Sequence, residues 1–286
     1  MEYISLYNGV KVPATGYGIY QIKPEECKDC VLNALKAGYR VFDTAQSYGN
    51  EAALGQALKE SGVSRKELFI ITKVRPHFYD DRTRESILES IKNLQTDYID
   101  LVLLHQPFGD VYKAYRELEI LYEEGKLKSI GLSNFYADRM VDISYFSKIK
   151  PMVNQVEIHP LHQRKDIVEW ANKLDIVLFA WSPLGHGRGM LHENPVLLSI
   201  AEKYKKTVAQ VILRWNFQRG IVTIPKTTKF LRMKENIDIF NFELSDKDIN
   251  EIEKLETGES VFYSHQDPAL IEKYALGVLK FKKENL

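Results

Sequence analysis

The 286-residue sequence lacks the features that mark several broad classes of protein. Its 39 lysine and arginine residues are balanced by 39 aspartate and glutamate residues, so no positive excess favours nucleic acid as a partner. No apolar run approaches the roughly 18 residues of a membrane-spanning helix, and residues 1–5 lack the basic-then-apolar order of a signal peptide. We therefore expect a soluble, cytoplasmic monomer that binds neither nucleic acid nor membrane.

Cysteine is nearly absent. The only two cysteines, Cys27 and Cys30, form a single Cys-x-x-Cys pair. A metal site would need a second pair of ligands, and a redox site would need a thioredoxin-like context, and neither is evident. The spacing instead places Cys27, Val31, Ala34 and Leu35 on one face of a helix, where free cysteine is commonly buried.

Two other binding signals are weak. His159 with His162, and His186 with His192, form close pairs without an obvious carboxylate partner, so we expect no metal site. The run Gly16-Tyr17-Gly18 lacks the third glycine of a dinucleotide-binding fingerprint, so it does not indicate a Rossmann fold.

The sequence does contain a regular alternation of short apolar runs and helical stretches. Residues 3–13 predict a hairpin, since Asn8-Gly9 lies between two short apolar runs. We expect strands over residues 15–19, 39–42, 68–73, 99–104, 129–132, 152–157, 176–180 and 221–224. We expect helices over residues 24–36, 51–59, 81–94, 111–123, 165–173, 195–204, 207–218 and 230–238, with another after Tyr136 and a last one beyond Pro268.

Eight strand-helix units follow one another without a linker rich in proline, glycine or serine. This arrangement predicts a single (β/α)8 TIM barrel over residues 1–286, with an N-terminal β-hairpin (3–13) and a C-terminal tail (257–286). A doubly wound parallel sheet is the alternative.

In such a barrel the carboxyl ends of the strands form one rim, and active sites are built there. Nearly every predicted strand ends in polar or aromatic side chains. Taken singly, each is more often a packed or solvated residue than a functional one. The residues expected at this rim are Gly18, Ile19, Tyr20, Asp43, Tyr48, Lys73, His105, Ser133, Asn134, Gln155, Trp181, Ser182, Lys226, Thr227 and Thr228.

Four of these residues suit proton transfer together. A phenol is a poor acid near neutrality unless a neighbouring charge favours its ionised form. We expect Lys73 to supply that charge to Tyr48, and Asp43 to hold Lys73 in place. His105 would add a group that hydrogen-bonds a substrate oxygen. Asn50, directly after this loop, is expected to cap the following helix.

Several motifs occur in a fixed order along the chain and together resemble the aldo-keto reductase family, especially its small bacterial-type members. The resemblance extends from the hairpin at Asn8-Gly9 to about residue 255. The motifs are Phe42-Asp43-Thr44-Ala45, Tyr48-Gly49-Asn50-Glu51, Ile71-Thr72-Lys73, Leu103-Leu104-His105, Gly131-Leu132-Ser133-Asn134-Phe135, Val153-Asn154-Gln155-Val156-Glu157 and Ile224-Pro225-Lys226.

The resemblance implies a barrel that binds NADPH across the rim and reduces aldehydes and ketones to alcohols by hydride transfer. Its implied catalytic residues are Asp43, Tyr48, Lys73 and His105, with Tyr48 as the general acid. Its implied cofactor-binding residues are Gly18, Ile19, Tyr20, Asp43, Ser133, Asn134, Gln155, Trp181, Ser182, Leu184, Lys226, Thr227, Thr228, Arg232, Glu235 and Asn236.

One part of that set also has a physical basis of its own, and another has a specific role that the resemblance implies. Lys226, Thr227, Thr228 and Arg232 place two cations and two hydroxyls at the start of a helix, which suits an anion. This pattern favours NADPH over NADH, because the 2′-phosphate would find partners there. The resemblance further implies that Trp181 stacks on the nicotinamide, while three polar side chains hold its carboxamide, namely Ser133, Asn134 and Gln155.

The chain departs from the family where relatives often carry tryptophan, since Tyr20, Arg75 and Gln106 stand at those positions. With Tyr48 and His105, these residues form our expected substrate site. The loop over residues 106–110 is also short, so we expect an open, polar pocket for small, polar or dicarbonyl substrates.

Residues 261–265 are expected to fold over the rim. The lysines at the end of the last helix, Lys280, Lys282 and Lys283, are expected to be solvated.

Two other functions fit parts of the pattern. An NADPH-binding sensor or auxiliary protein with little turnover would keep the cofactor residues, but it would not need all four catalytic residues. An unrelated barrel, such as a phosphosugar isomerase, would leave the residues from Lys226 to Asn236 without an explanation.

Overall fold

The short apolar runs form eight parallel strands of a barrel in the computed structural model, which describes residues 1–188 and 190–284. Each strand pairs with the next one along the chain. Hydrogen bonds from Gly16 N to Thr223 O (2.8 Å) and from Gly18 N to Pro225 O (3.0 Å) join the first strand to the last. The strands are β3 (Tyr17–Gly18), β4 (Val41–Asp43), β5 (Phe69–Val74), β6 (Leu101–Leu104), β7 (Ile130–Ser133), β8 (Val153–Glu157), β9 (Val177–Trp181) and β10 (Val222–Ile224).

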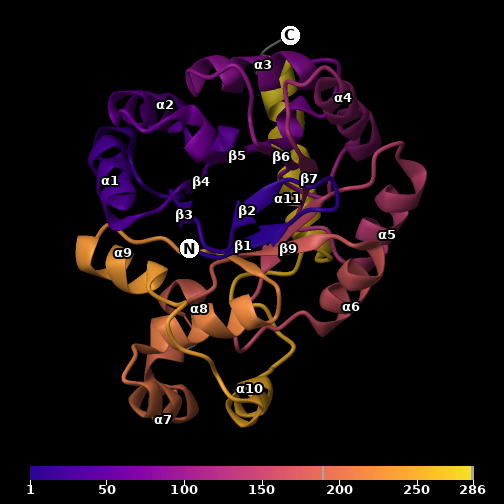
Figure 1. Ribbon diagram of the computed structural model, residues 1–286. Helices are drawn as coiled ribbons and strands as arrows, with labels where there is room; N and C mark the ends of the chain where they lie inside the picture. The colour runs from indigo at the N-terminus through magenta and orange to yellow at the C-terminus, as the bar shows by residue number, and fades with distance from the viewer. Residues whose placement is uncertain (189, 285–286) are drawn as a thin grey trace.

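This closure excludes the doubly wound alternative and confirms the (β/α)8 barrel. Figure 1 shows the helices arranged in a ring around the strands. Because helices cover the barrel on all sides, nearly every strand residue is buried, which explains the continuous apolar runs in the sequence. The helices are α1 (Pro24–Ala37), α2 (Glu51–Glu60), α3 (Thr83–Asn93), α4 (Val111–Glu123), α5 (Ala137–Phe146), α6 (Lys165–Leu174), α7 (Pro195–Tyr204), α8 (Val208–Gln218), α9 (Phe230–Ile237), α10 (Asp246–Glu253) and α11 (Pro268–Glu284).

Helix α10 and five short 3-10 helices were not expected from the periodicity. The start of α10 carries a sequence signal nonetheless, since Ser245 and Asp248 form a capping box. The 3-10 helices are η1 (Gln46–Tyr48), η2 (Arg65–Glu67), η3 (Pro76–Phe78), η4 (Gly185–Gly187) and η5 (Leu191–Glu193).

Both cysteines are buried in α1 and form no disulfide, and Val31, Ala34 and Leu35 are buried with them. The predicted helical core position of Cys27 is therefore confirmed.

The prediction that the Asn50 side chain caps α2 is wrong. Asn50 does precede the helix, but its side chain forms no capping hydrogen bond. Its Nδ2 instead donates to the carbonyl oxygens of Ile19 (3.0 Å) and Ile22 (3.1 Å), while its Oδ1 accepts from Thr44 Oγ1 (2.7 Å). Burial explains the difference, because an enclosed amide must satisfy both its donors and its acceptor. Asn50 thus ties the loop after β3 to the loop after β4.

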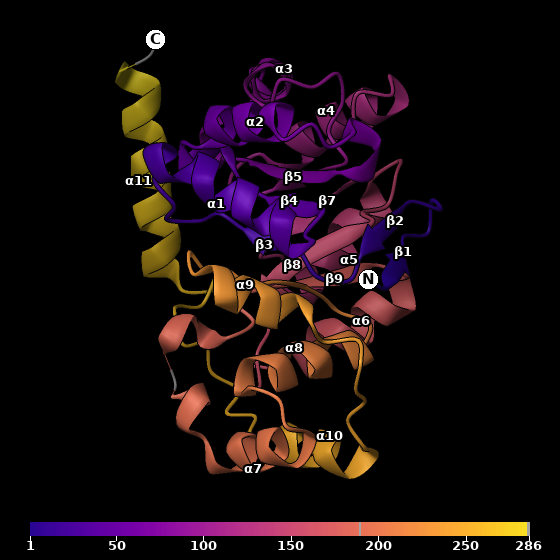
Figure 2. The ribbon, with the colours of Figure 1, turned by 60° about the vertical axis from the view of Figure 1, so that its left-hand side comes forward.

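The N-terminal hairpin and the C-terminal helix lie on opposite sides of the barrel. Strands β1 (Tyr3–Ser5) and β2 (Lys11–Pro13) form the expected antiparallel hairpin. Figure 2 shows this hairpin on the side away from α11, which runs along the molecule as a single long helix. Residues 285 and 286 of the expected tail lie outside the described residues.

Helix α11 packs against η3, while Lys280 and Lys283 at its end are exposed, as expected. Phe281 contacts the rings of His77 (5.1 Å between centroids) and Phe78 (5.7 Å). Lys282, expected to be solvated, forms an ion pair with Asp80 at 3.0 Å. No helix within residues 1–188 and 190–284 combines the length and apolarity needed to cross a membrane.

Candidate active site

A cavity of about 550 Å³ lies at the carboxyl ends of the strands. Asp43 is the last residue of β4, and the chain then turns through η1, whose last residue is Tyr48. Gly49 follows with φ of 69°, a left-handed conformation that glycine adopts without strain. The turn places the ring of Tyr48 in the cavity wall beside Lys73 and His105.

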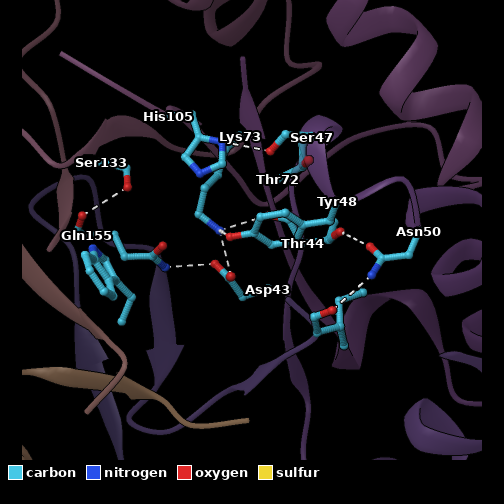
Figure 3. Close-up of polar contacts among 12 residues, drawn as sticks. Asp43, Thr44, Ser47, Tyr48, Asn50, Thr72, Lys73, His105, Ser133 and Gln155 are labelled. Carbon is cyan, nitrogen blue, oxygen red and sulfur yellow. Dashed lines mark hydrogen bonds and ion pairs between the residues drawn. The ribbon is translucent and has the colours of Figure 1, made fainter. Parts of the chain in front are cut away.

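The floor of this cavity contains a buried ion pair (Figure 3). Lys73 Nζ donates to Asp43 Oδ1 at 2.6 Å and to the Thr44 carbonyl oxygen at 2.9 Å. Gln155 Nε2 donates to the other carboxylate oxygen of Asp43 at 2.8 Å. The side chain of Lys73 is 1% exposed and that of Asp43 is 6% exposed, so the pair is shielded from water.

Tyr48 is the third partner of Lys73, whose Nζ lies 3.4 Å from the phenol oxygen. The contact is the expected one, but the expected pKa effect is not seen. Burial and then the Asp43 carboxylate raise the pKa of Tyr48 well above 10. The charge of Lys73 is largely balanced by Asp43, so the stabilisation that it gives a phenolate is smaller than the cost of enclosing that anion. Tyr48 is therefore a protonated phenol at physiological pH.

His105 also contacts the Tyr48 ring, with 5.8 Å between the ring centroids. Its Nδ1 is 3.4 Å from Ser47 Oγ. Burial, and then the charges of Lys73 and His265, lower the pKa of His105 to about 3. The imidazole is consequently neutral and suited to donate or accept a hydrogen bond, according to its tautomer.

The amide side chains at the ends of β7 and β8 form a connected group. Asn134 Nδ2 donates to the His105 carbonyl oxygen (3.0 Å), and Trp181 Nε1 donates to Asn134 Oδ1 (2.8 Å). Ser133 Oγ donates to the Gln155 carbonyl oxygen at 3.1 Å. These bonds fix the orientation of three polar or aromatic side chains that line the cavity.

A second cavity, of about 500 Å³, adjoins the first, and Leu184, His186 and Lys226 line both. Its wall includes Arg232 from α9. Within the part of the chain that the structure describes, neither Lys226 nor Arg232 forms an ion pair with a carboxylate. The cavity also includes Thr227, one of the hydroxyls expected at the anion site, and Glu235 and Asn236, which were expected only as cofactor-binding residues.

The structure therefore brings most of the expected site residues to two joined cavities. All five expected substrate residues line the first cavity. Ile19 and Thr228 line neither cavity, contrary to expectation. The side chain of Ile19 is buried in the core, and Thr228 is exposed beside the second cavity.

The C-terminal part of the chain supplies a wall that the sequence only partly indicated. Phe262 and Tyr263 line the cavity, as the expected fold of residues 261–265 over the rim requires. Tyr274 of α11 lines it too, and no motif had marked that residue. Its phenol accepts from Gln106 Nε2 at 3.4 Å.

This wall is anchored by Glu157 at the end of β8. Its carboxylate accepts from Ser260 Oγ (2.5 Å) and from Val261 N (3.1 Å). The ring Nε2 of His159 lies 2.9 Å from the same carboxylate, so His159 does have the acidic partner that the sequence did not reveal. The described residues contain no group of three or more His, Cys, Asp or Glu side chains placed to share a metal ion.

Comparison with known proteins identifies the family. The family model for the aldo/keto reductase family matches residues 8–257. The chain belongs to this family. Glyoxal reductase of Bacillus subtilis (strain 168) is 46% identical over 264 residues, which cover 90% of this chain and 94% of the relative. Methylglyoxal reductase DkgA of Escherichia coli (strain K12) is 39% identical over 261 residues, with coverage of 90% and 94%.

Solved structures of aldo-keto reductases share the fold. MGS-M4, an aldo-keto reductase from a Medee basin deep-sea metagenome library, superposes with a TM-score of 0.89 at 38% identity. The match covers 92% of this chain and 98% of MGS-M4. As a member of the aldo/keto reductase family, the chain is assigned to the oxidoreductases.

We predict that the imidazole of His105 stays neutral at all pH values above its lowered pKa of about 3. The unfolded chain binds this proton near pH 6.5, as does free histidine. Stability from the neutral ring is therefore complete above about pH 6.5 and is lost as pH falls toward the folded pKa. NMR titration of the imidazole nitrogens, assigned with His105→Gln, tests this. A midpoint near that of free histidine would contradict it.

Proposed function

We propose that this aldo/keto reductase family member reduces small aldehydes and ketones with NADPH. The contact of Tyr48 with the buried Lys73–Asp43 pair carries the proposal. A protonated phenol beside a buried ammonium is a proton donor whose conjugate base is stabilised at once. When bound, NADPH supplies the hydride that the carbonyl carbon accepts.

Proton transfer is then the task of the protein. Tyr48 donates its proton to the carbonyl oxygen as negative charge develops there. Lys73 stabilises the resulting phenolate through the contact at 3.4 Å. Neutral His105 lies in the same cavity wall and orients the carbonyl oxygen by a hydrogen bond.

The two joined cavities fit an extended dinucleotide. Trp181 presents an aromatic ring to the first cavity, whose wall also contains Ser133, Asn134 and Gln155. These groups suit a nicotinamide and its carboxamide. Lys226 and Arg232 at the second cavity, which pair with no carboxylate in the described part of the chain, suit a phosphate, and this supports NADPH over NADH.

The substrate end of the first cavity is polar. Tyr20, Arg75 and Gln106 stand there in place of larger apolar groups, and Phe262 and Tyr263 limit its size. We therefore propose small, polar or dicarbonyl substrates. Methylglyoxal should give a higher kcat/KM than a bulky aromatic ketone, and the reverse order would reject this choice.

Tyr48→Phe should lower kcat for methylglyoxal reduction by about 10²- to 10⁴-fold, because it removes the proton donor and little else. Loss of NADPH absorbance measures turnover, and fluorescence titration measures cofactor binding, which should survive. Tyr145→Phe is the matched control, since Tyr145 is an exposed phenol on α5. Retention of activity by Tyr48→Phe would reject the acid role.

Arg232→Ala should raise the KM for NADPH about tenfold or more, as expected for the loss of a hydrogen bond to a charged group. The KM for NADH should stay nearly unchanged, because NADH lacks the 2′-phosphate. Lys234→Ala removes a cation from the same helix but does not line the cavity, so it should leave both constants unchanged. Equal effects of Arg232→Ala on both cofactors would contradict the assignment.

A further inference from the structure

The wall of the active-site cavity contains a cation without a counter-ion. Arg75 lines the cavity that Tyr48 and His105 also line. Among residues 1–188 and 190–284, no carboxylate forms an ion pair with its guanidinium. Burial and the charge of Arg82 lower the pKa of Arg75, which shows that the surroundings do not compensate its charge.

The carboxylates nearby in the chain are already engaged. Asp80 accepts from Arg82 Nη2 at 2.8 Å and pairs with Lys282 at 3.0 Å. Asp43, which also lines the cavity, pairs with Lys73 at 2.6 Å. Among the described residues, Arg75 therefore has no carboxylate partner to give up when an anion enters.

The guanidinium of Arg75 is nevertheless held in place. Its Cζ lies 4.5 Å from the ring centroid of Phe78 and 4.8 Å from that of Phe281. The backbone N of Arg75 donates to Gln46 Oε1 at 3.1 Å, and this bond connects the Arg75 backbone to the turn that carries Tyr48. The buried Nε has no hydrogen-bond partner among the described residues. A fixed planar fork with unused donors suits a carboxylate, which can accept two parallel hydrogen bonds.

The position of Arg75 is on the substrate side of the site. Arg75 comes two residues after Lys73, and the backbone there is extended. Both side chains therefore point to the same side, with their Cα atoms about 7 Å apart. In the closed strand order, β5 is four places from β9, so Arg75 lies across the barrel from Trp181. Lys226 and Arg188, the other cations of the cavity that lack carboxylate partners, lie near the ends of β10 and β9 instead.

We propose that Arg75 binds a carboxylate of the substrate, so that the enzyme selects carbonyl compounds that also carry an acid group. This inference rests on the proposed reductase function and names its substrate class. The carboxylate contacts the Arg75 guanidinium while the carbonyl oxygen of the same molecule contacts Tyr48 and His105. Neutral dicarbonyls fill the same cavity without this contact and react less efficiently.

The test compares acids with their esters, which keep the carbonyl group but lose the negative charge. The pairs are succinic semialdehyde with its methyl ester, and para-carboxybenzaldehyde with its methyl ester. The wild-type enzyme should prefer each acid in kcat/KM by about tenfold or more, the ratio expected for a charge-assisted hydrogen bond. Arg75→Gln should bring the acid-to-ester ratio close to one while preserving ester turnover, and Arg75→Lys should retain part of the preference.

Arg116→Gln is the control for net charge, because Arg116 is exposed on α4 and distant in sequence from the cavity residues. It should leave the ratio unchanged. If Arg75→Gln lowers acid and ester turnover equally, Arg75 only packs α11 against η3, and the inference fails. If the wild type reduces acids and esters equally, the inference also fails while the reductase function stands. If the wild type oxidises NADPH with methylglyoxal but with none of the four compounds, the inference fails while the reductase function stands, and if it oxidises NADPH with none of the five, the proposed function itself fails.

Discussion

The ion pair between Lys73 and Asp43 is the interaction on which the rest of the site depends. Taking an ammonium out of water costs several kcal/mol unless a carboxylate and further hydrogen bonds replace its hydration. Here the Asp43 carboxylate and the Thr44 carbonyl oxygen accept from Lys73, and Gln155 donates to the other oxygen of Asp43, so strands β4, β5 and β8 must be in register for the pair to form. The closed barrel and the placement of Tyr48 beside Lys73 are therefore parts of one arrangement.

The pair also determines which charges remain in the cavity. Because Asp43 balances Lys73, Tyr48 keeps its proton, and burial keeps His105 neutral. The charge that is left is positive, on Arg75 at one side and on Lys226 and Arg188 at the other. A cofactor and a substrate that each carry a negative group at the outer end would complement this distribution. The reacting carbon would then lie between the two negative groups.

Much of this architecture could be predicted from the sequence, because the carboxyl ends of the strands in a (β/α)8 barrel converge whatever the length and sequence of the loops. Asp43, Lys73 and His105 each end an apolar run, and the barrel brings them together. The role of Asn50 could not be predicted, since an amide before a helix resembles a cap until its burial is known. Tyr274 was equally hidden, because its helix is brought to the cavity by tertiary contacts, among them the packing of Phe281 and a hydrogen bond to Gln106. The high pKa of Tyr48 depends on enclosure, which residue types alone do not reveal.

The central claim is that the cavity transfers hydride from a reduced nicotinamide to a carbonyl carbon. The most direct measurement uses NADPH with deuterium at the transferable position of the nicotinamide ring, together with methylglyoxal and the purified protein. Mass spectrometry of the product then locates the label. The account predicts an alcohol that carries deuterium on the former carbonyl carbon. No alcohol, or an alcohol without deuterium, would contradict it.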